Sequence, residues 1–332
     1  MSYVAVIGGG SWGTVLSILI AEKEYDISLW VYEEDLAREI NRTGVNGAYL
    51  PDVPLPKHLK VSSRLSDVLS GARYIVNVVP TQHSRAVFSS ASPYIPEDAV
   101  IVSAAKGIEK GTLMTVSSVL REVTGRDVSA LSGPSFAREV VRHLPTAVTL
   151  ASKDYSTGLL LQELFTAEHF RVYTHHDVLG VELGGALKNV IAVAAGISDG
   201  LGLGNNARAA LITRGLAEIT RLGVLMGASE HTFSGLSGLG DLVLTCTSNL
   251  SRNYTVGHSL AKGLRLQEIL GATRAVAEGV ETAKSAYDLA KKNNIEMPVV
   301  EKVYSVLYES KEPKAAVAEL MNRALKPEFY GH

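Results

Sequence analysis

A lysine in the middle of the chain, Lys188, borders a strongly apolar segment. The segment 182–196 has no polar side chain from Val190 to Ala195. It is shorter than the roughly 20 apolar residues of a membrane-spanning helix, so the pattern predicts a buried helix. A lysine at the edge of such a helix either extends its amine into water or is held in a cleft, where burial lowers its pKa and lets it exchange a proton with a substrate. The segment alone favours the first interpretation; motifs elsewhere in the chain favour the second.

A glycine motif near the N-terminus predicts a dinucleotide-binding site. Gly8, Gly10 and Gly13 have the spacing G-x-G-x-x-G. The motif follows a β-branched run, Tyr3 to Ile7, and leads into an apolar periodic segment, Thr14 to Ala21, so we expect a strand, a turn and a helix. In such a turn the glycines allow a pyrophosphate to approach the backbone, and N–H groups at the helix start, here near Ser11 and Trp12, bind it.

The residues after the second predicted strand, Ile27 to Tyr32, bear on the type of dinucleotide. An acidic run begins at Glu33, about twenty residues beyond the last glycine of the motif. A carboxylate at this position commonly binds the adenosine ribose hydroxyls and repels a 2′-phosphate, which favours NAD. The alternative is an acidic first turn of the next helix, 35–41, where negative charge suits the helix dipole. The sequence leaves both interpretations open, with Tyr32 and Glu33 as candidate cofactor contacts.

Further strands predict a doubly wound sheet. They are Tyr74 to Val79, Ala99 to Ser103, Asp127 to Leu131, Ala147 to Ala151 and His169 to Tyr173. The uninterrupted apolar run 74–79 should be a central, buried, parallel strand. Doubly wound sheets bind ligands at the carboxyl ends of their strands. Lys106 follows the strand 99–103 at this edge, where a nicotinamide ring or a substrate would lie.

The second half of the chain has helical periodicity from Leu183 onward. Examples are the segments 211–225, 260–270, 283–292 and 299–308. The segment Asp241 to Thr245 could be strand or helix, and two glycine-rich stretches, 199–205 and 235–241, are expected to be loops. The fold class is therefore an α/β Rossmann-type doubly wound N-terminal domain, residues 1–180, followed by an all-α C-terminal domain, residues 181–332.

A second candidate anion site is the sequence Ser251-Arg252-Asn253. It combines a hydroxyl, a planar guanidinium and an amide at a predicted helix start, a combination suited to an oxyanion. The alternative is a polar loop with a capping serine. The loop 277–282, which leads into another helix, is also compatible with simple capping. The histidine and cysteine spacings predict no metal site.

The amino-acid composition argues against some classes of binding partner. Lysine and arginine number 32 against 34 aspartates and glutamates, so no basic field is expected for nucleic acid or an anionic membrane. The single cysteine, Cys246, excludes an intramolecular disulfide and suits a reducing compartment. The N-terminal residues lack the pattern of a signal peptide. We expect a cytoplasmic protein.

The motifs together resemble one known family. In order, they are Gly8-Gly-Gly-Ser-Trp-Gly13, Val79-Pro-Thr-Gln82, Ser103-Ala-Ala-Lys-Gly-Ile-Glu109, Leu131-Ser-Gly-Pro-Ser-Phe-Ala137, Glu182-Leu-Gly-Gly-Ala-Leu-Lys-Asn189, Gly238-Leu-Gly-Asp241, Ser251-Arg-Asn253 and Ala277-Glu-Gly279. Over nearly the whole chain they are similar to bacterial NAD(P)-dependent glycerol-3-phosphate dehydrogenases. The resemblance implies reversible reduction of dihydroxyacetone phosphate to sn-glycerol 3-phosphate for glycerophospholipid synthesis, by a cytoplasmic homodimer that uses NAD or NADP.

The resemblance also implies roles for individual residues. Lys188 looks like the proton donor and acceptor, with Asp241 orienting it or a substrate hydroxyl. The substrate-binding positions would be Lys106, Gly133, Ser135, Lys188, Asp241, Ser251, Arg252 and Asn253. The cofactor-contacting positions would be Ser11, Trp12, Lys106, Ala137, Arg252, Val276 and Glu278, in addition to the glycines of the turn.

One departure from the family concerns NADP. Many relatives have an arginine just after the second strand, whereas this chain has Tyr32 and Glu33 there, and Arg38 or Arg42 would have to supply the charge. Two other functions fit parts of the sequence. A related two-domain reductase would act on a 2-keto or 3-hydroxy acid, and a nucleotide-binding redox sensor would have no turnover. The sensor gives no reason for Lys188, Lys106 and Arg252 to occur together.

Overall fold

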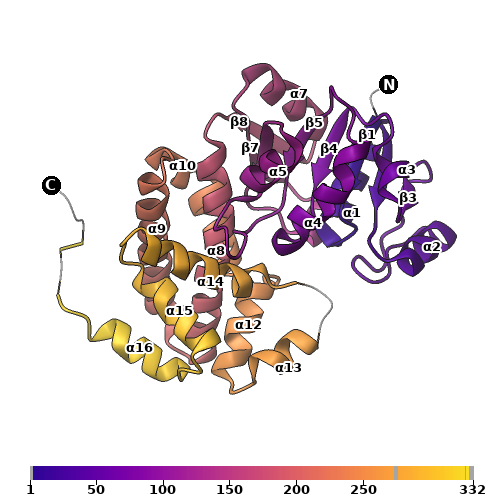
Figure 1. Ribbon diagram of the computed structural model, residues 1–332. Helices are drawn as coiled ribbons and strands as arrows, with labels where there is room; N and C mark the ends of the chain where they lie inside the picture. Colours follow the sequence, from indigo (N-terminus) through magenta and orange to yellow (C-terminus); the bar gives the residue numbers. More distant parts are fainter. Residues whose placement is uncertain (1–2, 273–275, 326, 329–332) are drawn as a thin grey trace.

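The computed structural model describes residues 3–272, 276–325 and 327–328. An N-terminal α/β region is followed by a C-terminal region made of helices, and the long helix α8 (Val178–Gly200) lies between them (Figure 1). The predicted fold class is confirmed.

The N-terminal region is built on one eight-stranded sheet. Its strands are β1 (Tyr3–Ile7), β2 (Asp26–Trp30), β3 (Lys60–Ser62), β4 (Tyr74–Asn77), β5 (Val100–Ser103), β6 (Val128–Ser132), β7 (Thr146–Ala151) and β8 (Phe170–His175). The order is β3-β2-β1-β4-β5-β6-β7-β8. All neighbouring strands are parallel except β6 and β7. As predicted, β4 is fully buried and lies between β1 and β5, near the reversal of strand order where such sheets bind ligands.

Sequence analysis missed the edge strand β3. It has only three residues, and just one of them, Val61, is buried. So short a segment has no alternating pattern to detect. Its pairing with Ser28 to Trp30 is visible only in the tertiary structure.

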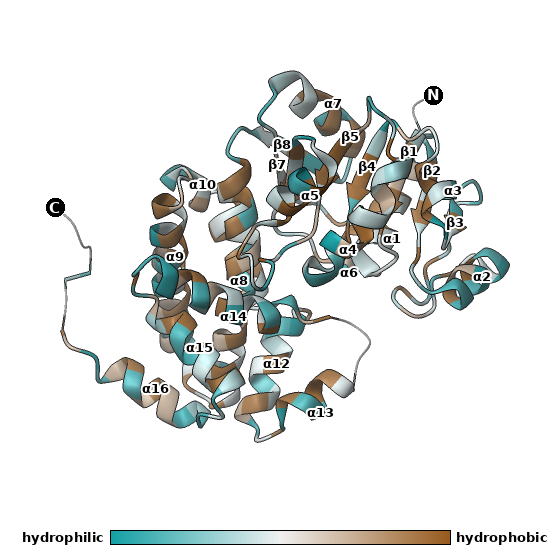
Figure 2. Cartoon of the chain, viewed as in Figure 1, coloured by the Kyte–Doolittle hydropathy of each residue, from teal (hydrophilic) through white to brown (hydrophobic). Residues whose placement is uncertain are grey.

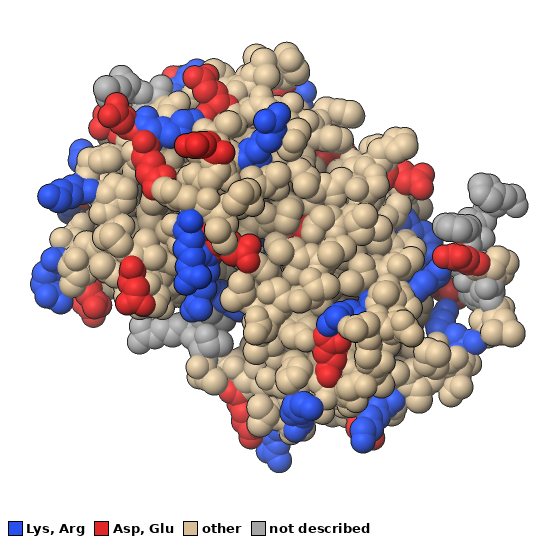
Figure 3. All heavy atoms as spheres, turned by 180° about the vertical axis from the view of Figure 1, so that it is seen from behind, with Lys and Arg blue, Asp and Glu red and all other residues tan. Residues whose placement is uncertain are grey.

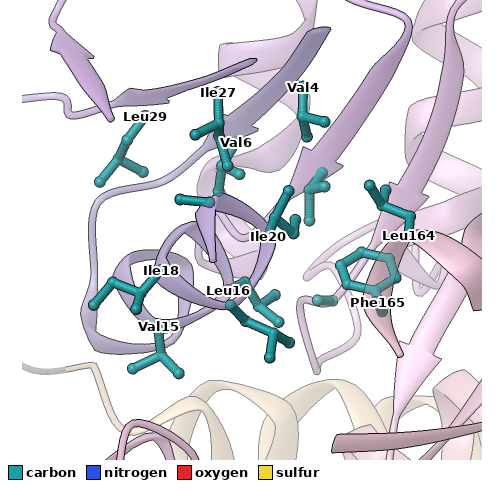
Figure 4. Packing of buried hydrophobic residues seen from close by; sticks show 14 of the residues in the cluster. Val4, Val6, Val15, Leu16, Ile18, Ile20, Ile27, Leu29, Leu164 and Phe165 are labelled. Carbon is teal, nitrogen blue, oxygen red and sulfur yellow. The ribbon is translucent and has the colours of Figure 1, made fainter. Parts of the chain in front are cut away.

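Helices cover the sheet, and the hydrophobic core lies between these helices and the strands. The N-terminal helices are α1 (Ser11–Ala21), α2 (Glu34–Thr43), α3 (Leu65–Leu69), α4 (Thr81–Ala91), α5 (Val116–Thr124), α6 (Ala137–Val140) and α7 (Tyr155–Phe165), with a 3₁₀ turn η1 (Ser92–Tyr94). Apolar side chains of α1 such as Leu16 and Ile20 pack beside Val6 and Ile27 of the strands and Phe165 of α7 (Figure 4). Burying this face fixes α1, and therefore the glycine turn before it, against the sheet.

The C-terminal region contains the remaining helices. They are α8, α9 (Gly204–Leu225), α10 (Glu230–Phe233), the π-helical turn η2 (Leu236–Gly240), α11 (Asp241–Cys246), α12 (Arg252–Ala261), α13 (Leu266–Gly271), α14 (Glu278–Lys292), α15 (Pro298–Tyr308) and α16 (Pro313–Met321). Helix α8 is apolar around much of its surface (Figure 2) and packs against β6, α9, α11, α12 and α14. The helix is long and apolar enough to cross a membrane, but 89% of its apolar 18-residue stretch is buried inside the protein, as in the core helix of a globular protein.

Three local expectations for this region are wrong. The segment 260–270 is two helices, α12 and α13, because Gly263 between them has a left-handed φ of 90° that a helix cannot include. Asp199 and Gly200 belong to the last turn of α8, where Asp199 accepts hydrogen bonds from Arg208 and Tyr254, both at 2.7 Å. The stretch 235–241 is largely the π-helical turn η2 rather than a loop.

A buried carboxylate joins the two regions. Glu182 of α8 accepts hydrogen bonds from the main-chain N and the Oγ of Ser117, at 2.7 and 2.5 Å, in the first turn of α5. Burial raises the pKa of Glu182, and the hydrogen bonds from Ser117 act in the opposite direction. The start of α8 is thus held against the N-terminal region, six residues before Lys188.

Candidate active site

An added side chain would clash at two glycines of the turn, but the third glycine faces open space that a ligand can occupy. A Cβ on Gly13 would lie 1.9 Å from the carbonyl oxygen of Gly8, and one on Gly8 would lie 2.7 Å from that of Val78. At Gly10, by contrast, nothing lies within 4 Å of an added Cβ. Gly10 is also the N-cap of α1 and provides no side-chain cap. The helix therefore presents N–H groups toward open space, an arrangement that fits a dinucleotide pyrophosphate.

Arg252 reaches this turn from the other region. Its Nη2 donates to Ser11 Oγ at 3.2 Å and its Nη1 to the main-chain oxygen of Val276 at 3.5 Å. Its neighbour Ser251 caps α12, the helix that Arg252 begins, by accepting from the Tyr254 N at 3.2 Å. A cation therefore faces the same helix N-terminus as the glycines.

The three residues of the predicted anion cluster do not face one point. Ser251 is buried and occupied as a helix cap. Asn253 is buried too: its Nδ2 donates to Asn189 Oδ1 at 2.9 Å and its Oδ1 accepts from the Gly279 N at 2.9 Å. The capping alternative therefore describes Ser251, whereas the guanidinium of Arg252 is directed to Ser11 and Val276.

The chemically distinctive cluster is Lys188, Asp241 and Lys106. Asp241 Oδ1 accepts from Lys188 Nζ at 2.5 Å and its Oδ2 accepts from Lys106 Nζ at 2.7 Å. The three side chains are 7%, 1% and 17% exposed, so the ammonium groups share one carboxylate largely away from water. Lys188 is therefore held in place rather than extended into solvent. Two lysines around one carboxylate leave a net positive charge beside α8.

Thr245 completes the cluster and was missed by sequence analysis. Its Oγ1 accepts from Lys188 Nζ at 2.8 Å and donates to the main-chain oxygen of Asp241 at 2.6 Å. A helical interpretation of 241–245 would have placed Thr245 one turn after Asp241, on the same face. The sequence left helix and strand open for this segment, and α11 settles it as helix.

The pKa of Lys188 is lowered from 10.5 to about 8. Burial is the largest cause, Asp241 opposes it, and the charge of Lys106 lowers the pKa further. Arg252 contacts Ser11 and Val276 and is not among the charges that shift this pKa. Cys246, next to Thr245, is buried, and burial raises the pKa of its thiol to about 12, so it stays a neutral thiol at physiological pH.

The turn after β6 supports the cluster through backbone atoms. The carbonyl oxygen of Gly133 accepts from Lys106 Nζ at 3.0 Å and from Ser135 Oγ at 2.9 Å. Gly133 has φ 139°, and a Cβ there would lie 2.9 Å from the Cα of Val148, so only glycine fits. Ala137, at the start of α6, is half-buried. The structure thus brings Gly133 and Ser135, two positions that the resemblance assigned to substrate binding, close to Lys106.

Glu278 lies opposite the end of β4. Its Oε1 accepts from the main-chain N of Thr81 at 3.0 Å, at the start of α4. The side chain of Thr81 also hydrogen-bonds to the Glu278 carboxylate, and the Thr81 Oγ1 and Glu278 Oε2 are buried. Burial raises the pKa of Glu278 to about 7. Glu278 therefore connects the helical region to the edge of the sheet at which such folds bind ligands.

Tyr32 and Glu33 lie on the surface at the end of β2. Tyr32 is 77% exposed and makes an edge-to-face contact with Trp30, with ring centroids 6.1 Å apart. Glu33 is exposed and is the N-cap residue of α2. Arg38, one candidate for binding a 2′-phosphate, pairs instead with Asp35 at 2.5 Å.

Fold and site together define a class: a dinucleotide-dependent oxidoreductase whose helical region brings a buried lysine to the cofactor-binding sheet. Family models for the N-terminus and the C-terminus of NAD-dependent glycerol-3-phosphate dehydrogenase match residues 3–158 and 177–318. The chain belongs to the NAD(P)-dependent glycerol-3-phosphate dehydrogenase family.

Individual relatives agree over nearly the whole chain. A glycerol-3-phosphate dehydrogenase [NAD(P)+] from Syntrophotalea carbinolica is 54% identical over 330 residues, covering 98% of this chain and 99% of the relative. One from Geobacter sulfurreducens is 54% identical over 329 residues, covering 98% of both. The crystal structure of glycerol-3-phosphate dehydrogenase from Coxiella burnetii has a TM-score of 0.94 at 42% identity, covering 97% of this chain and 99% of that one.

Proposed function

We propose that this protein reversibly reduces dihydroxyacetone phosphate to sn-glycerol 3-phosphate with NAD(P)H, and that Lys188 is its general acid and base. The observation that supports this most strongly is the buried cluster of Lys188, Asp241 and Lys106. A carbonyl that accepts hydride accumulates negative charge on oxygen, so a proton donor must lie beside that oxygen. Bound NAD(P)H supplies the hydride.

The residues of the buried cluster would have distinct roles in this reaction. Lys188, held by Asp241 and Thr245, would donate its proton to the forming alkoxide and take one back in the reverse direction. Lys106, on the other carboxylate oxygen, would add a second positive charge near that oxygen. Asp241 would keep both ammonium groups in fixed positions, which supplies orientation in advance of the reaction.

Arg252 is our candidate for binding phosphate. Its contact with Ser11 supports a role beside the glycine turn, where it would bind the cofactor pyrophosphate and border the substrate phosphate. Ser251 and Asn253, which the sequence suggested as direct ligands, would act by holding Arg252 and α12 in place. The contact of Glu278 with Thr81, at the ligand-binding edge of the sheet, supports its assignment to the cofactor.

Membership of the family supports proposals about the roles of the two regions, the cellular location, the oligomeric state and the pathway. We propose that residues 1–180 bind the dinucleotide and residues 181–332 supply the catalytic lysine and much of the substrate site. We also propose a cytoplasmic homodimer whose product enters glycerophospholipid synthesis. On the face seen in Figure 3, lysine and arginine are interspersed with aspartate and glutamate. Such mixing suits a small-molecule enzyme better than a nucleic-acid-binding protein.

An NADH-oxidation assay with dihydroxyacetone phosphate tests the proposal directly. Turnover of this substrate and none of a 2-keto acid of similar size would support it. A preference for the 2-keto acid would instead support the related class of reductases, and dinucleotide binding without any turnover would support a redox sensor.

The pH dependence of the two directions should be opposite. With a pKa of about 8, Lys188 is protonated below this pH and can donate, so the rate of ketone reduction should fall as the pH rises through about 8. Alcohol oxidation requires the neutral amine and should rise over the same range. Profiles of kcat in both directions check this. Reduction and oxidation rates that change in the same direction across this pH would contradict the assignment.

Cofactor preference should respond to Glu33. We expect the native chain to prefer NADH, because the Glu33 carboxylate would repel a 2′-phosphate. Glu33→Arg should raise the ratio of kcat/KM for NADPH to that for NADH by roughly 10- to 100-fold, the effect of one charge-assisted hydrogen bond. Glu34→Arg, one residue further into α2, is the matched control and should change the ratio little. Equal effects of the two substitutions would show that general charge, rather than Glu33, sets the preference.

A further inference from the structure

Three potential metal ligands meet on the surface of the N-terminal region, although the sequence spacing predicted none. They are Glu22 at the end of α1, His143 after α6 and His169 before β8. One ligand atom from each lies within 4.8 Å of the other two, and no other group of three such residues occurs within the described ranges. The residues are far apart in sequence, so only the tertiary structure brings them together.

Backbone contacts fix the positions of the two histidines. His143 has a left-handed φ of 57°, and its N–H donates to the Val140 carbonyl at 2.9 Å. The carbonyl of His169 accepts from the Thr146 N at 2.9 Å, beside the first residue pair of β7 and β8. The two imidazole rings stack with centroids 4.1 Å apart, and the His143 Nε2 lies 3.1 Å from Glu22 Oε1. The cluster is therefore already assembled.

The electrostatics favour metal binding. A metal ion binds the neutral imidazole. The Glu22 carboxylate adds the negative charge that a divalent cation requires.

We propose that Glu22, His143 and His169 form a binding site for a divalent transition-metal ion of the zinc type. Two imidazoles and one carboxylate are ligands that Zn²⁺ accepts, and water would complete its four-fold coordination. Bond lengths of 2.0–2.2 Å place tetrahedral ligand atoms about 3.4 Å apart. The side chains of His143 and Glu22, 57% and 36% exposed, are free to turn and close the remaining distance.

The bound ion would add a further link among three segments that already contact one another, through the hydrogen bond from the Thr146 N to His169 and the contact of His143 with Glu22. The segments are the end of α1, the connection from α6 to β7 and the connection from α7 to β8. Because the ion would bind only the folded arrangement, it should stabilise the protein as its concentration rises. The site uses none of the residues assigned to catalysis, so its role would be structural.

The test uses the full-length protein without a histidine tag, stripped of metal by a chelator. Titration calorimetry with ZnCl₂ should give one saturable site, and the melting temperature should rise with added Zn²⁺. Glu22→Gln, which keeps the side-chain shape, and His143→Ala with His169→Ala should each weaken binding more than about tenfold, since even indirect contacts to a metal are worth 10- to 100-fold.

A second stacked histidine pair in the same protein provides the control. His175 and His176 have ring centroids 4.9 Å apart, but the Nδ1 of His175 already accepts from the Asp177 N at 2.9 Å. His175→Ala with His176→Ala should leave Zn²⁺ binding unchanged. Absence of a saturable site in the native protein, or equal losses in both pairs of histidine variants, would overturn the proposal.

Discussion

Replacing Lys188 with methionine should remove nearly all turnover while leaving dinucleotide binding close to native. Methionine fills a similar volume but has no proton to donate, and positioned general acid–base catalysis contributes about 10²–10⁴-fold to a rate. We therefore expect kcat for ketone reduction to fall by about that factor. Steady-state rates give kcat, and quenching or enhancement of NADH fluorescence gives the dissociation constant of the cofactor.

The stability of this variant should change less than its activity. Asp241 keeps Lys106 as a partner at 2.7 Å, so its buried carboxylate is not left without a cation. Lys110→Met, which removes a half-exposed lysine paired with Glu281, is the matched control and should retain native kcat. A Lys188→Met enzyme with native kcat would falsify the proposed role of the lysine.

Replacing Asp241 with asparagine should impair both catalysis and folding. The carboxylate is 1% exposed and is the shared partner of two ammonium groups, so its loss leaves two like charges close together without a counter-charge. Removing one partner of a buried ion pair costs about 3–5 kcal/mol of unfolding free energy. Asp241 also raises the pKa of Lys188 against the effect of burial. Without it the lysine should be largely neutral at pH 7 and a poor proton donor.

Two measurements on Asp241→Asn distinguish these effects. Denaturant unfolding gives the stability loss, and the pH profile of ketone reduction should shift to lower pH. Thr245→Val is the control, because it removes an uncharged hydrogen-bond partner of Lys188 and keeps the carboxylate. We expect a smaller loss of kcat for this variant and a midpoint displaced less than in Asp241→Asn. A similar profile for all three proteins would mean that Asp241 does not set the protonation of Lys188.

Local sequence patterns predicted the structure correctly where the residues of one segment alone determine it. The strand Tyr3–Ile7 was predicted to the residue, because its apolar run ends at a glycine turn. The burial of the segment around Lys188 also followed from its lack of polar side chains. The predictions failed for segments whose structure depends on contacts with residues distant in the sequence. The edge strand β3 needs its neighbour β2, and the π-helical turn η2 packs against Gly184 of α8.

For the site, the sequence by itself determined which chemical groups are available. A glycine turn for a pyrophosphate and a lysine beside an apolar helix are readable from residue type and spacing, and the family resemblance adds a candidate carboxylate. Only the tertiary structure decided which of them meet. It placed one carboxylate between Lys106 and Lys188, which are 82 positions apart, directed Arg252 to Ser11, and added Thr245. The physical reason is that side-chain chemistry is a local property, whereas a lowered lysine pKa depends on burial and on charges that only folding brings within a few ångströms.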